Sequence, residues 1–195
     1  MRTAFIKRDT SETQIELSIE LDGSGRHMIE TGVPFFNHML EAFSKHGLFD
    51  LDIKAQGDLD VDTHHTVEDV GIVLGKAIDE ALGDKRGITR FGQALIPMDE
   101  ALLLAAVDIS GRGQLHWDVE VPIEFIGTFD SSLFKEFLIA LAHNAGLTLH
   151  VRKLAGENTH HCIEAAAKAC ARALAQAVAL DPRAPQSVPS TKGSI

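Results

Sequence analysis

The sequence has no tyrosine and one tryptophan, so we do not expect aromatic platforms for stacking nucleic-acid bases. Basic residues are also in the minority, with 18 lysines and arginines against 28 aspartates and glutamates. An acidic chain repels a phosphate backbone. We therefore expect no nucleic-acid partner.

Long apolar runs are absent too. None reaches the roughly 18 residues that a membrane-spanning helix needs, so we expect no membrane partner. The opening stretch, MRTAFIKRDTSETQ, has no apolar core of the kind found in signal peptides. The only cysteines, Cys162 and Cys170, are separated by about 12 Å along an apparent helix, which is too far for a disulfide between them. These absences predict a reducing, cytoplasmic location.

Histidine, in contrast, is abundant, with 10 residues in the chain. Four of them form two adjacent pairs, in DTHHTVEDVG (residues 62–71) and NTHHCIEAAAK (residues 158–168). His160 follows His64 after 96 residues. This concentration of histidine indicates metal binding.

The order of predicted elements repeats around the two motifs. In the first half, alternation and helical spacing predict strands at 3–9, 13–21 and 48–57, and helices at 34–47 and 66–83. In the second half, the same patterns predict strands at 99–110, 114–121 and 147–154, and helices at 131–146 and 160–178. Each half thus contains a helix, a glycine, a strand, a loop, the HHxxE motif and a second helix.

This repetition predicts an internally duplicated α+β fold, in which two similar halves each cover a small sheet with helices. The predicted segments are a first repeat at 1–93, a second repeat at 94–180 and a tail at 181–195. The tail contains three prolines and no periodicity. It is either loose or held by a ligand.

The spacing of HHxxE allows each half to hold part of a metal site. Residues i and i+3 of a helix lie within about 60° of each other, so His65 can share an ion with Glu68, and His161 with Glu164. The preceding histidines, His64 and His160, face elsewhere and are free to complete the site of the other half. Imidazole and carboxylate ligands together suit Zn, Mn, Fe, Co or Ni. The alternative is that these side chains only begin a helix, solvated or capping its first turn, and the matched repeat argues against it.

Several longer segments, taken in order, resemble the imidazoleglycerol-phosphate dehydratases in their single-function form. The matching segments are RDTSET, TGVPFFNHMLEAFSKHG, DTHHTVEDVG, RGITRFGQALIPMDEAL, DISGRG, NAGLTLHVRKLAGENTHHCIEA and VPSTKG. They cover essentially the whole chain, and no DxDxT phosphatase motif precedes them. The resemblance implies a fold like domain 2 of ribosomal protein S5.

The resemblance also implies two manganese ions in each active site. One ion would be held by His38, His65, Glu68 and His160. The other would be held by His64, His161, Glu164 and a residue of the preceding helix, where many family members have histidine and this chain has Glu136. A carboxylate is an acceptable ligand for manganese. His143, on the same predicted helix, is the competitor for this last position.

Further residues match the substrate contacts of the family. The phosphate and substrate contacts implied by the resemblance are Arg90, Arg112, Lys168, Ser190 and Lys192. His38 and His46 match residues that line the substrate pocket, and Glu12 matches a mobile carboxylate near the reacting carbons. Glu12 is the leading candidate for the catalytic acid or base, and His46 is the second.

The implied reaction converts imidazoleglycerol phosphate into imidazole acetol phosphate in histidine biosynthesis. It is chemically demanding, because the proton to be lost lies on a carbon with no adjacent carbonyl. If metal ions bind both ring nitrogens, the ring is stabilised as an imidazolate and expels the neighbouring hydroxyl. The resulting diazafulvene makes the next proton acidic, and its loss leads to the ketone.

The resemblance finally implies a homo-oligomer of twenty-four chains with the active sites between subunits. Two other functions share parts of the pattern. A two-metal phosphatase or other hydrolase would use similar ligands to attack a phosphate, and would release phosphate in place of forming a ketone. A non-catalytic metal-binding assembly protein would show no turnover, and would leave Arg90 and Arg112 without a role.

Overall fold

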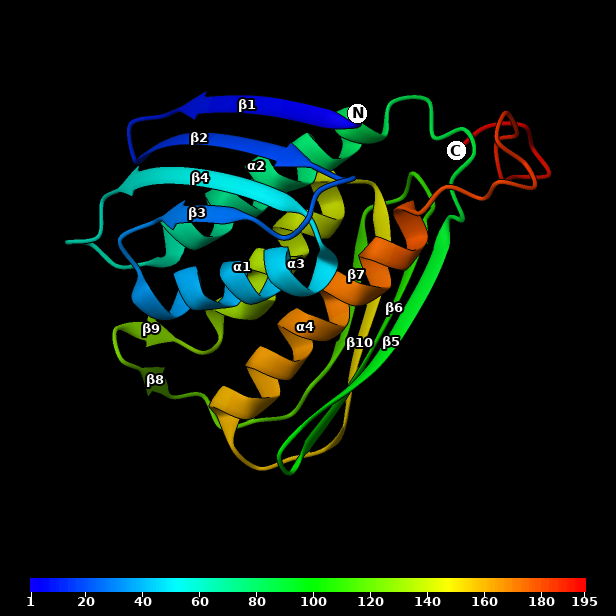
Figure 1. The fold of residues 1–195 in the computed structure, drawn as a ribbon. Coiled ribbons are helices and arrows are strands. Elements are labelled where there is room, and N and C mark those ends of the chain that lie inside the picture. Colours follow the sequence, from blue (N-terminus) through cyan, green and yellow to red (C-terminus); the bar gives the residue numbers. More distant parts are fainter.

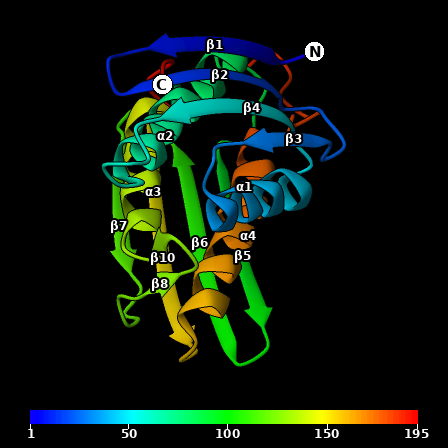
Figure 2. The same cartoon turned by 90° about the vertical axis from the view of Figure 1, so that its left-hand side faces the viewer.

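Two four-stranded sheets enclose four helices in the computed structural model, which describes residues 1–195 (Figures 1 and 2). The first sheet lies across the top of both views, and the second stands roughly upright below it. The helices fill the space between the sheets, so the apolar faces of both sheets point inward. None of the helices is long and apolar enough to cross a membrane.

The first half contributes one sheet in the strand order β1-β2-β4-β3. Its strands are β1 (Thr3–Asp9), β2 (Thr13–Glu20), β3 (His27–Glu30) and β4 (Asp50–Gly57). Neighbours are antiparallel except β3 and β4, which are parallel. Helix α1 (Pro34–Gly47) joins β3 to β4, and α2 (His64–Leu82) follows β4.

The second half builds its sheet by the same rule, in the order β5-β6-β10-β7. Its strands are β5 (Phe91–Met98), β6 (Ala101–Ile109), β7 (Gln114–Asp118) and β10 (Leu147–Ala155). Here β7 and β10 form the parallel pair. Helix α3 (Leu133–Asn144) precedes β10, and α4 (Thr159–Val178) follows it.

The shared order of strands and helices confirms the predicted α+β fold with two similar halves. The second half carries one addition, a short hairpin of β8 (Phe125–Ile126) and β9 (Phe129–Asp130) between β7 and α3. The predicted boundary between residues 93 and 94 falls inside β5, whose first residue already pairs with the second sheet.

The sequence patterns missed β3, β5 and this hairpin. β3 has four residues and the hairpin strands have two each, which is too short for an alternation to be recognised. β5 contains Gly92 and Pro97, both unusual within strands, but it is an edge strand where proline is tolerated. Gly92 also lets α4 approach, because a Cβ there would lie 1.9 Å from the Ala173 carbonyl oxygen.

Helices α2 and α3 pack backbone against backbone through two glycines of α2. A Cβ on Gly71 would lie 2.6 Å from the Phe137 carbonyl oxygen, and one on Gly75 would lie 2.7 Å from that of Leu141. Only glycine permits this approach. Because both contacts advance by four residues, α2 and α3 run side by side in the same direction.

The two cysteines, Cys162 and Cys170, are both buried in α4 as free thiols, as expected.

The tail beyond α4 makes hydrogen bonds with the segment between α2 and β5. The Gly87 backbone N–H donates to the Ser187 carbonyl at 2.9 Å, and the Arg90 guanidinium donates to the Pro189 carbonyl at 2.8 Å. The tail is therefore held by contacts with the rest of the chain.

Candidate metal and phosphate sites

Three potential metal ligands meet where α1 packs against the start of α4. Side-chain donor atoms of His38, His160 and Glu164 all lie within 4.8 Å of one another. The Glu164 carboxylate lies 3.1 Å from His160 Nε2 and 3.3 Å from His38 Nε2. We call these residues the α4 cluster. Because α1 belongs to the first half and α4 to the second, the duplicated halves jointly build this cluster.

Local sequence explains the position of His160. Asn158 caps α4, accepting a hydrogen bond from the His161 backbone N–H at 3.1 Å, so the helix begins at the histidine pair. The ring of Phe35 then packs edge-on against the His160 ring at 4.9 Å between centroids. The imidazole is held between its own helix and α1.

Charge on Glu164 is balanced from the next turn of the same helix. Lys168 Nζ lies 2.8 Å from the Glu164 carboxylate, which is itself buried. Burial raises the pKa of this carboxyl, but the Lys168 ammonium and the His38 ring outweigh burial and leave the pKa below its usual value. Glu164 is therefore ionised at neutral pH, as a metal ligand must be.

His161 points to a different carboxylate. Its Nδ1 lies 2.8 Å from Glu100 Oε2, in the turn between β5 and β6. This hydrogen bond raises the pKa of His161 and lowers that of Glu100 to about 2. The ring is thus tied to the second sheet, and its Nε2 makes no hydrogen bond.

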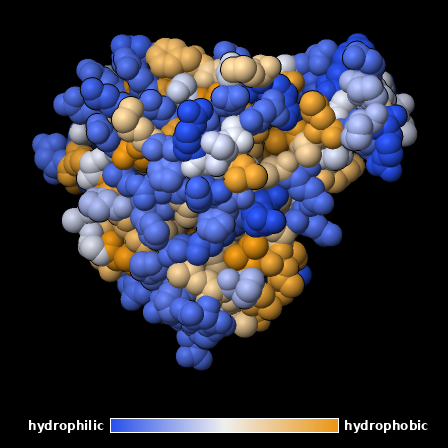
Figure 3. All heavy atoms as spheres, in the orientation of Figure 1, coloured by the Kyte–Doolittle hydropathy of each residue, from blue (hydrophilic) through white to orange (hydrophobic).

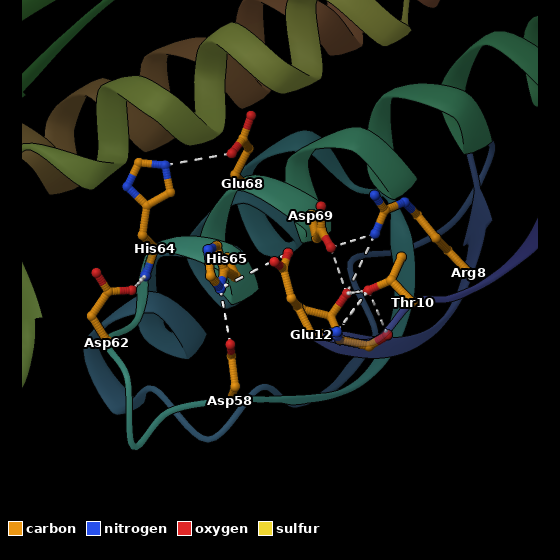
Figure 4. A network of polar contacts seen from close by, with 10 residues as sticks. Arg8, Thr10, Glu12, Asp58, Asp62, His64, His65, Glu68 and Asp69 are labelled. Atoms are coloured by element: carbon orange, nitrogen blue, oxygen red, sulfur yellow. Dashed lines mark hydrogen bonds and ion pairs between the residues drawn. The ribbon is translucent and has the colours of Figure 1, made fainter.

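The first histidine pair begins α2 and has its own group of carboxylates (Figure 4). His64 Nε2 lies 3.4 Å from Glu68, while His65 Nδ1 lies 3.0 Å from Asp58 and 4.0 Å from Glu12. The Asp58 hydrogen bond raises the pKa of His65. We call these five residues the α2 cluster.

The contacts within each HHxxE motif differ from the expected spacing. Glu68 contacts His64 and Glu164 contacts His160, so both contacts are i,i+4 and not the predicted i,i+3. Both spacings place side chains on one helix face. The second histidines are drawn away by carboxylates outside the helix. The metal-ligand assignments themselves stay predictions.

Only some of the predicted ligand sets come together within one chain. His38 and His160, expected to share an ion, do meet. Their expected co-ligands His65 and Glu68 are not in that group, and Glu164, expected at the other ion, is. In Figure 1, α2 begins at the left of the molecule and α4 begins at its lower end.

The register of α3 against α2 separates the two candidates for the remaining ligand. Glu136 precedes Phe137, which contacts Gly71, so Glu136 lies nearer to the start of α2. His143 is about 10 Å further along the axis of α3, where its backbone contacts Gly113. The geometry favours Glu136 as a neighbour of the α2 cluster.

Four of the five predicted phosphate contacts line one cavity of about 220 Å³ beside the tail. They are Arg90, Arg112, Ser190 and Lys192. Arg90 is oriented by Asp108, which accepts from its Nε at 2.7 Å. Lys168, the fifth, lies elsewhere, next to Glu164. His46 lies near Lys168, and partial burial with the charges of Lys168 and Arg172 lowers its pKa.

Two residues near the histidines escaped the sequence patterns, namely Asp58 and Glu100. Asp58 stands in the acidic stretch DLDVD, where nothing marks one aspartate out from the others. Glu100 could have been found from the internal repeat. It directly precedes the second strand of its half, as Glu12 does in the first half.

Comparison with known proteins identifies the family. The family model described as imidazoleglycerol-phosphate dehydratase matches residues 31–174. Proteins named imidazoleglycerol-phosphate dehydratase from Moorella thermoacetica and Dinoroseobacter shibae are each 57% identical to the chain. The alignments cover 100% of this chain, and 98% and 100% of the two relatives.

Solved structures agree with the sequence relatives. The imidazoleglycerol-phosphate dehydratase of Staphylococcus aureus superposes with a TM-score of 0.83 at 42% identity, over 92% of this chain and 99% of the other. That of Pyrococcus furiosus gives a TM-score of 0.84 at 39% identity, over 97% of this chain and 100% of the other. The chain belongs to the imidazoleglycerol-phosphate dehydratase family and is an enzyme of the hydro-lyase class.

Proposed function

We propose that the enzyme removes water from imidazoleglycerol phosphate to form imidazole acetol phosphate, a step of histidine biosynthesis, with two manganese ions in each active site. The observation that carries the proposal is the α4 cluster, where two imidazoles and a carboxylate from both halves converge within 4.8 Å. These are the ligand types that a metal ion needs if it is to bind the imidazole ring of the substrate at this position.

The donors in both clusters fit manganese. Imidazole nitrogens and carboxylate oxygens are present, and the three grouped donors of the α4 cluster include neither of the two buried thiols. The proposed ligands are His38, His64, His65, Glu68, Glu136, His160, His161 and Glu164. When bound, the ions would act as Lewis acids on the ring nitrogens of the substrate and favour departure of the hydroxyl beside the ring.

The cavity beside the tail is the proposed phosphate site. Its two arginines and one lysine supply charge-assisted donors, and Ser190 adds a hydroxyl. Arginine binds a phosphate through two parallel N–H bonds, which fixes the orientation of the bound group. Lys168, which lies next to Glu164 on α4, is proposed to contact the substrate at the α4 cluster and not in this cavity.

Proton transfer is assigned to Glu12, with His46 as the second candidate. The Glu12 side chain is 53% exposed and makes no short contact with His65, so it is free to move toward a substrate. A carboxylate within reach of the reacting carbon can take up its proton. His46, whose lowered pKa favours the neutral ring, can also accept a proton.

The distance between the α4 cluster and the phosphate cavity supports a site in which one substrate molecule contacts more than one chain. The Arg90 backbone N–H donates to Ala177, near the end of α4, whereas His160 is at its start, about 25 Å away along the axis. The ring and phosphate of the substrate are separated by roughly 6 Å of carbon chain, at bond lengths near 1.5 Å. This distance supports the proposal that the α4 cluster and the phosphate cavity that bind one substrate molecule belong to different chains.

We therefore propose that the active sites lie between subunits of a homo-oligomer, which the family resemblance puts at twenty-four chains. The α2 cluster of one copy would face the α4 cluster of another, and each metal ion would take donors from both. Shared ligands of this kind give the assembly a chemical reason to be closed and symmetric.

The test is turnover by purified protein with Mn²⁺ and imidazoleglycerol phosphate. Formation of the ketone, detected by its enolate absorbance in alkali, is the expected result. Release of inorganic phosphate without ketone would instead establish a phosphatase and would contradict the proposal.

A further inference from the structure

The second histidine of each pair is held in the same way in both halves. His65 Nδ1 lies 3.0 and 3.2 Å from the Asp58 oxygens, and His161 Nδ1 lies 2.8 Å from Glu100. Neither carboxylate belongs to the helix that carries its histidine. The first histidines, His64 and His160, instead turn Nε2 toward a glutamate on their own helix.

A carboxylate on Nδ1 decides which ring nitrogen is available to a metal. A neutral imidazole has one N–H and one lone pair, and an ionised carboxylate can only accept, so the proton resides on Nδ1. The lone pair is then on Nε2. Asp99 is 3.7 Å from His161 Nε2, beyond hydrogen-bond distance, so this nitrogen remains free.

The duplication places a glutamate at the same point of both halves, but the two glutamates differ in use. Glu12 directly precedes β2 and Glu100 directly precedes β6. Glu100 is bonded to His161, and its carboxylate also accepts from the Asn158 backbone N–H at 3.0 Å. Glu12 is 4.0 Å from His65, because Asp58 occupies the nearer position.

We propose that Asp58 and Glu100 are positioning residues that fix Nε2 of His65 and His161 as the metal-facing nitrogen. This rests on the proposed function, since it takes both histidines as metal ligands. In the first half Asp58 performs the task, which leaves Glu12 free for proton transfer. In the second half the positioning residue is Glu100, the counterpart of Glu12. Glu100 is therefore not available for proton transfer.

The proposal is tested by the Kd for Mn²⁺ of the metal-stripped enzyme, measured from the electron paramagnetic resonance signal of free Mn²⁺. Outer carboxylates of this kind contribute about 10- to 100-fold to metal affinity. Glu100→Ala and Asp58→Ala should each weaken binding by that factor. Glu100→Gln and Asp58→Asn keep an oxygen acceptor for Nδ1–H and should recover most of the affinity.

Controls separate positioning from folding. Asp84→Ala removes an exposed turn carboxylate that pairs only with Arg86, and should leave the Kd unchanged. Circular dichroism and thermal unfolding of the metal-free variants check the fold. If Glu100→Ala does not fold, Glu100→Met preserves the bulk of the side chain without the acceptor and replaces it in the comparison.

Two results would overturn the proposal. Unchanged Mn²⁺ affinity in both alanine variants would show that neither carboxylate positions a ligand. Equal weakening in the alanine and amide variants would indicate that the carboxylates bind the ion directly. Loss of affinity in Glu100→Ala, in an enzyme that forms no ketone from imidazoleglycerol phosphate, would support positioning and contradict the proposed reaction.

Discussion

Among individual side chains, the carboxylates around the histidines differ in how firmly they are held. Glu100 and Asp58 are hydrogen-bonded to imidazoles, Glu164 is buried against Lys168, and Glu12 is half-exposed beside His65. A group that transfers protons has to change partners during the reaction, whereas a ligand or positioning group has to stay in place. The exposure of Glu12 supports its proposed role in proton transfer.

Glu12→Gln should test this assignment. Glutamine preserves size and hydrogen bonding but cannot take up the proton, so we expect kcat to fall by about 100-fold or more while KM changes little. Steady-state kinetics with imidazoleglycerol phosphate would measure both. Near-normal turnover would exclude Glu12 and transfer the role to His46.

A second residue, Asp50, links stability to pH. Its carboxylate accepts from the backbone N–H groups of Ser24 at 2.7 Å and Arg26 at 3.0 Å, and from Arg26 Nε at 2.8 Å. These bonds, the one from Ser24 first, lower the pKa of Asp50 below its usual 3.8 in the folded chain. The stabilisation is therefore present above pH 3.8 and is lost as the pH falls through the lower folded value.

Asp50→Ala should lower the free energy of unfolding by about 2 kcal/mol at pH 7, because hydrogen bonds to a charged group are lost. The difference from wild type should shrink as the pH falls below 3.8. Denaturant unfolding between pH 7 and pH 3 would measure it, with Asp52→Ala, on the exposed face of β4, as the control. A difference that stays constant over this range would contradict the role of Asp50.

The helices and strands show which features could be read from the sequence. Helix α1 was predicted from Pro34 to Gly47 and has those bounds, because a proline begins it, a glycine ends it and apolar residues repeat along one face. β3 and β5 were missed, since their stability comes from pairing with neighbouring strands far along the chain and not from local alternation.

The same distinction holds for the candidate sites. Both histidine pairs and the cationic residues could be predicted because their side chains form recognisable motifs. Asp58 and Glu100 could not, since each gains a role only when the fold brings it to a histidine; the pairs are 7 and 61 residues apart. Because His65 and His161 are bonded to these carboxylates outside the helices, the i,i+4 contacts of Glu68 and Glu164 with the first histidines were not expected either.

The tail provides a test of the phosphate site as an element. Ser190 and Lys192 line the cavity with Arg90 and Arg112, while the core of the chain ends with α4. Deleting residues 188–195 should raise KM about 10- to 100-fold, the loss expected for one or two charge-assisted bonds, and leave the thermal midpoint nearly unchanged. Arg183→Ala, in the same tail but outside the cavity, is the control. Unchanged KM after the deletion would show that the tail does not bind the phosphate.

For the molecule as a whole, the three groups of functional residues lie at different corners. The α2 cluster is at the left of Figure 1, the α4 cluster at the bottom and the tail at the upper right. Most of the face seen in Figure 3 is polar, but hydrophobic residues gather at its lower right, on the side of the second sheet. Phe91, Leu95 and Leu154 of this sheet are all more than half exposed. Such a surface is consistent with contacts between copies.

Metal removal should change the assembly if ions join donors from different copies. Ions that bind only the assembled form shift the equilibrium toward it by mass action. Adding EDTA should therefore release smaller species together with loss of activity, and Mn²⁺ should restore both. Light scattering would follow the change. An active monomer with manganese bound would contradict shared sites.

The most direct measurement is complementation between two inactive variants. His65→Ala damages only the α2 cluster and His161→Ala damages only the start of α4, so each homogeneous assembly should be inactive. If every active site combines the start of α2 from one copy with the start of α4 from another, randomly mixed assemblies in equal amounts should have about one quarter of wild-type activity. The mixture would be made by removing metal, combining the variants and adding Mn²⁺. A mixed assembly, verified by differently tagged chains, that remains as inactive as its parents would show that both clusters of a site come from one chain.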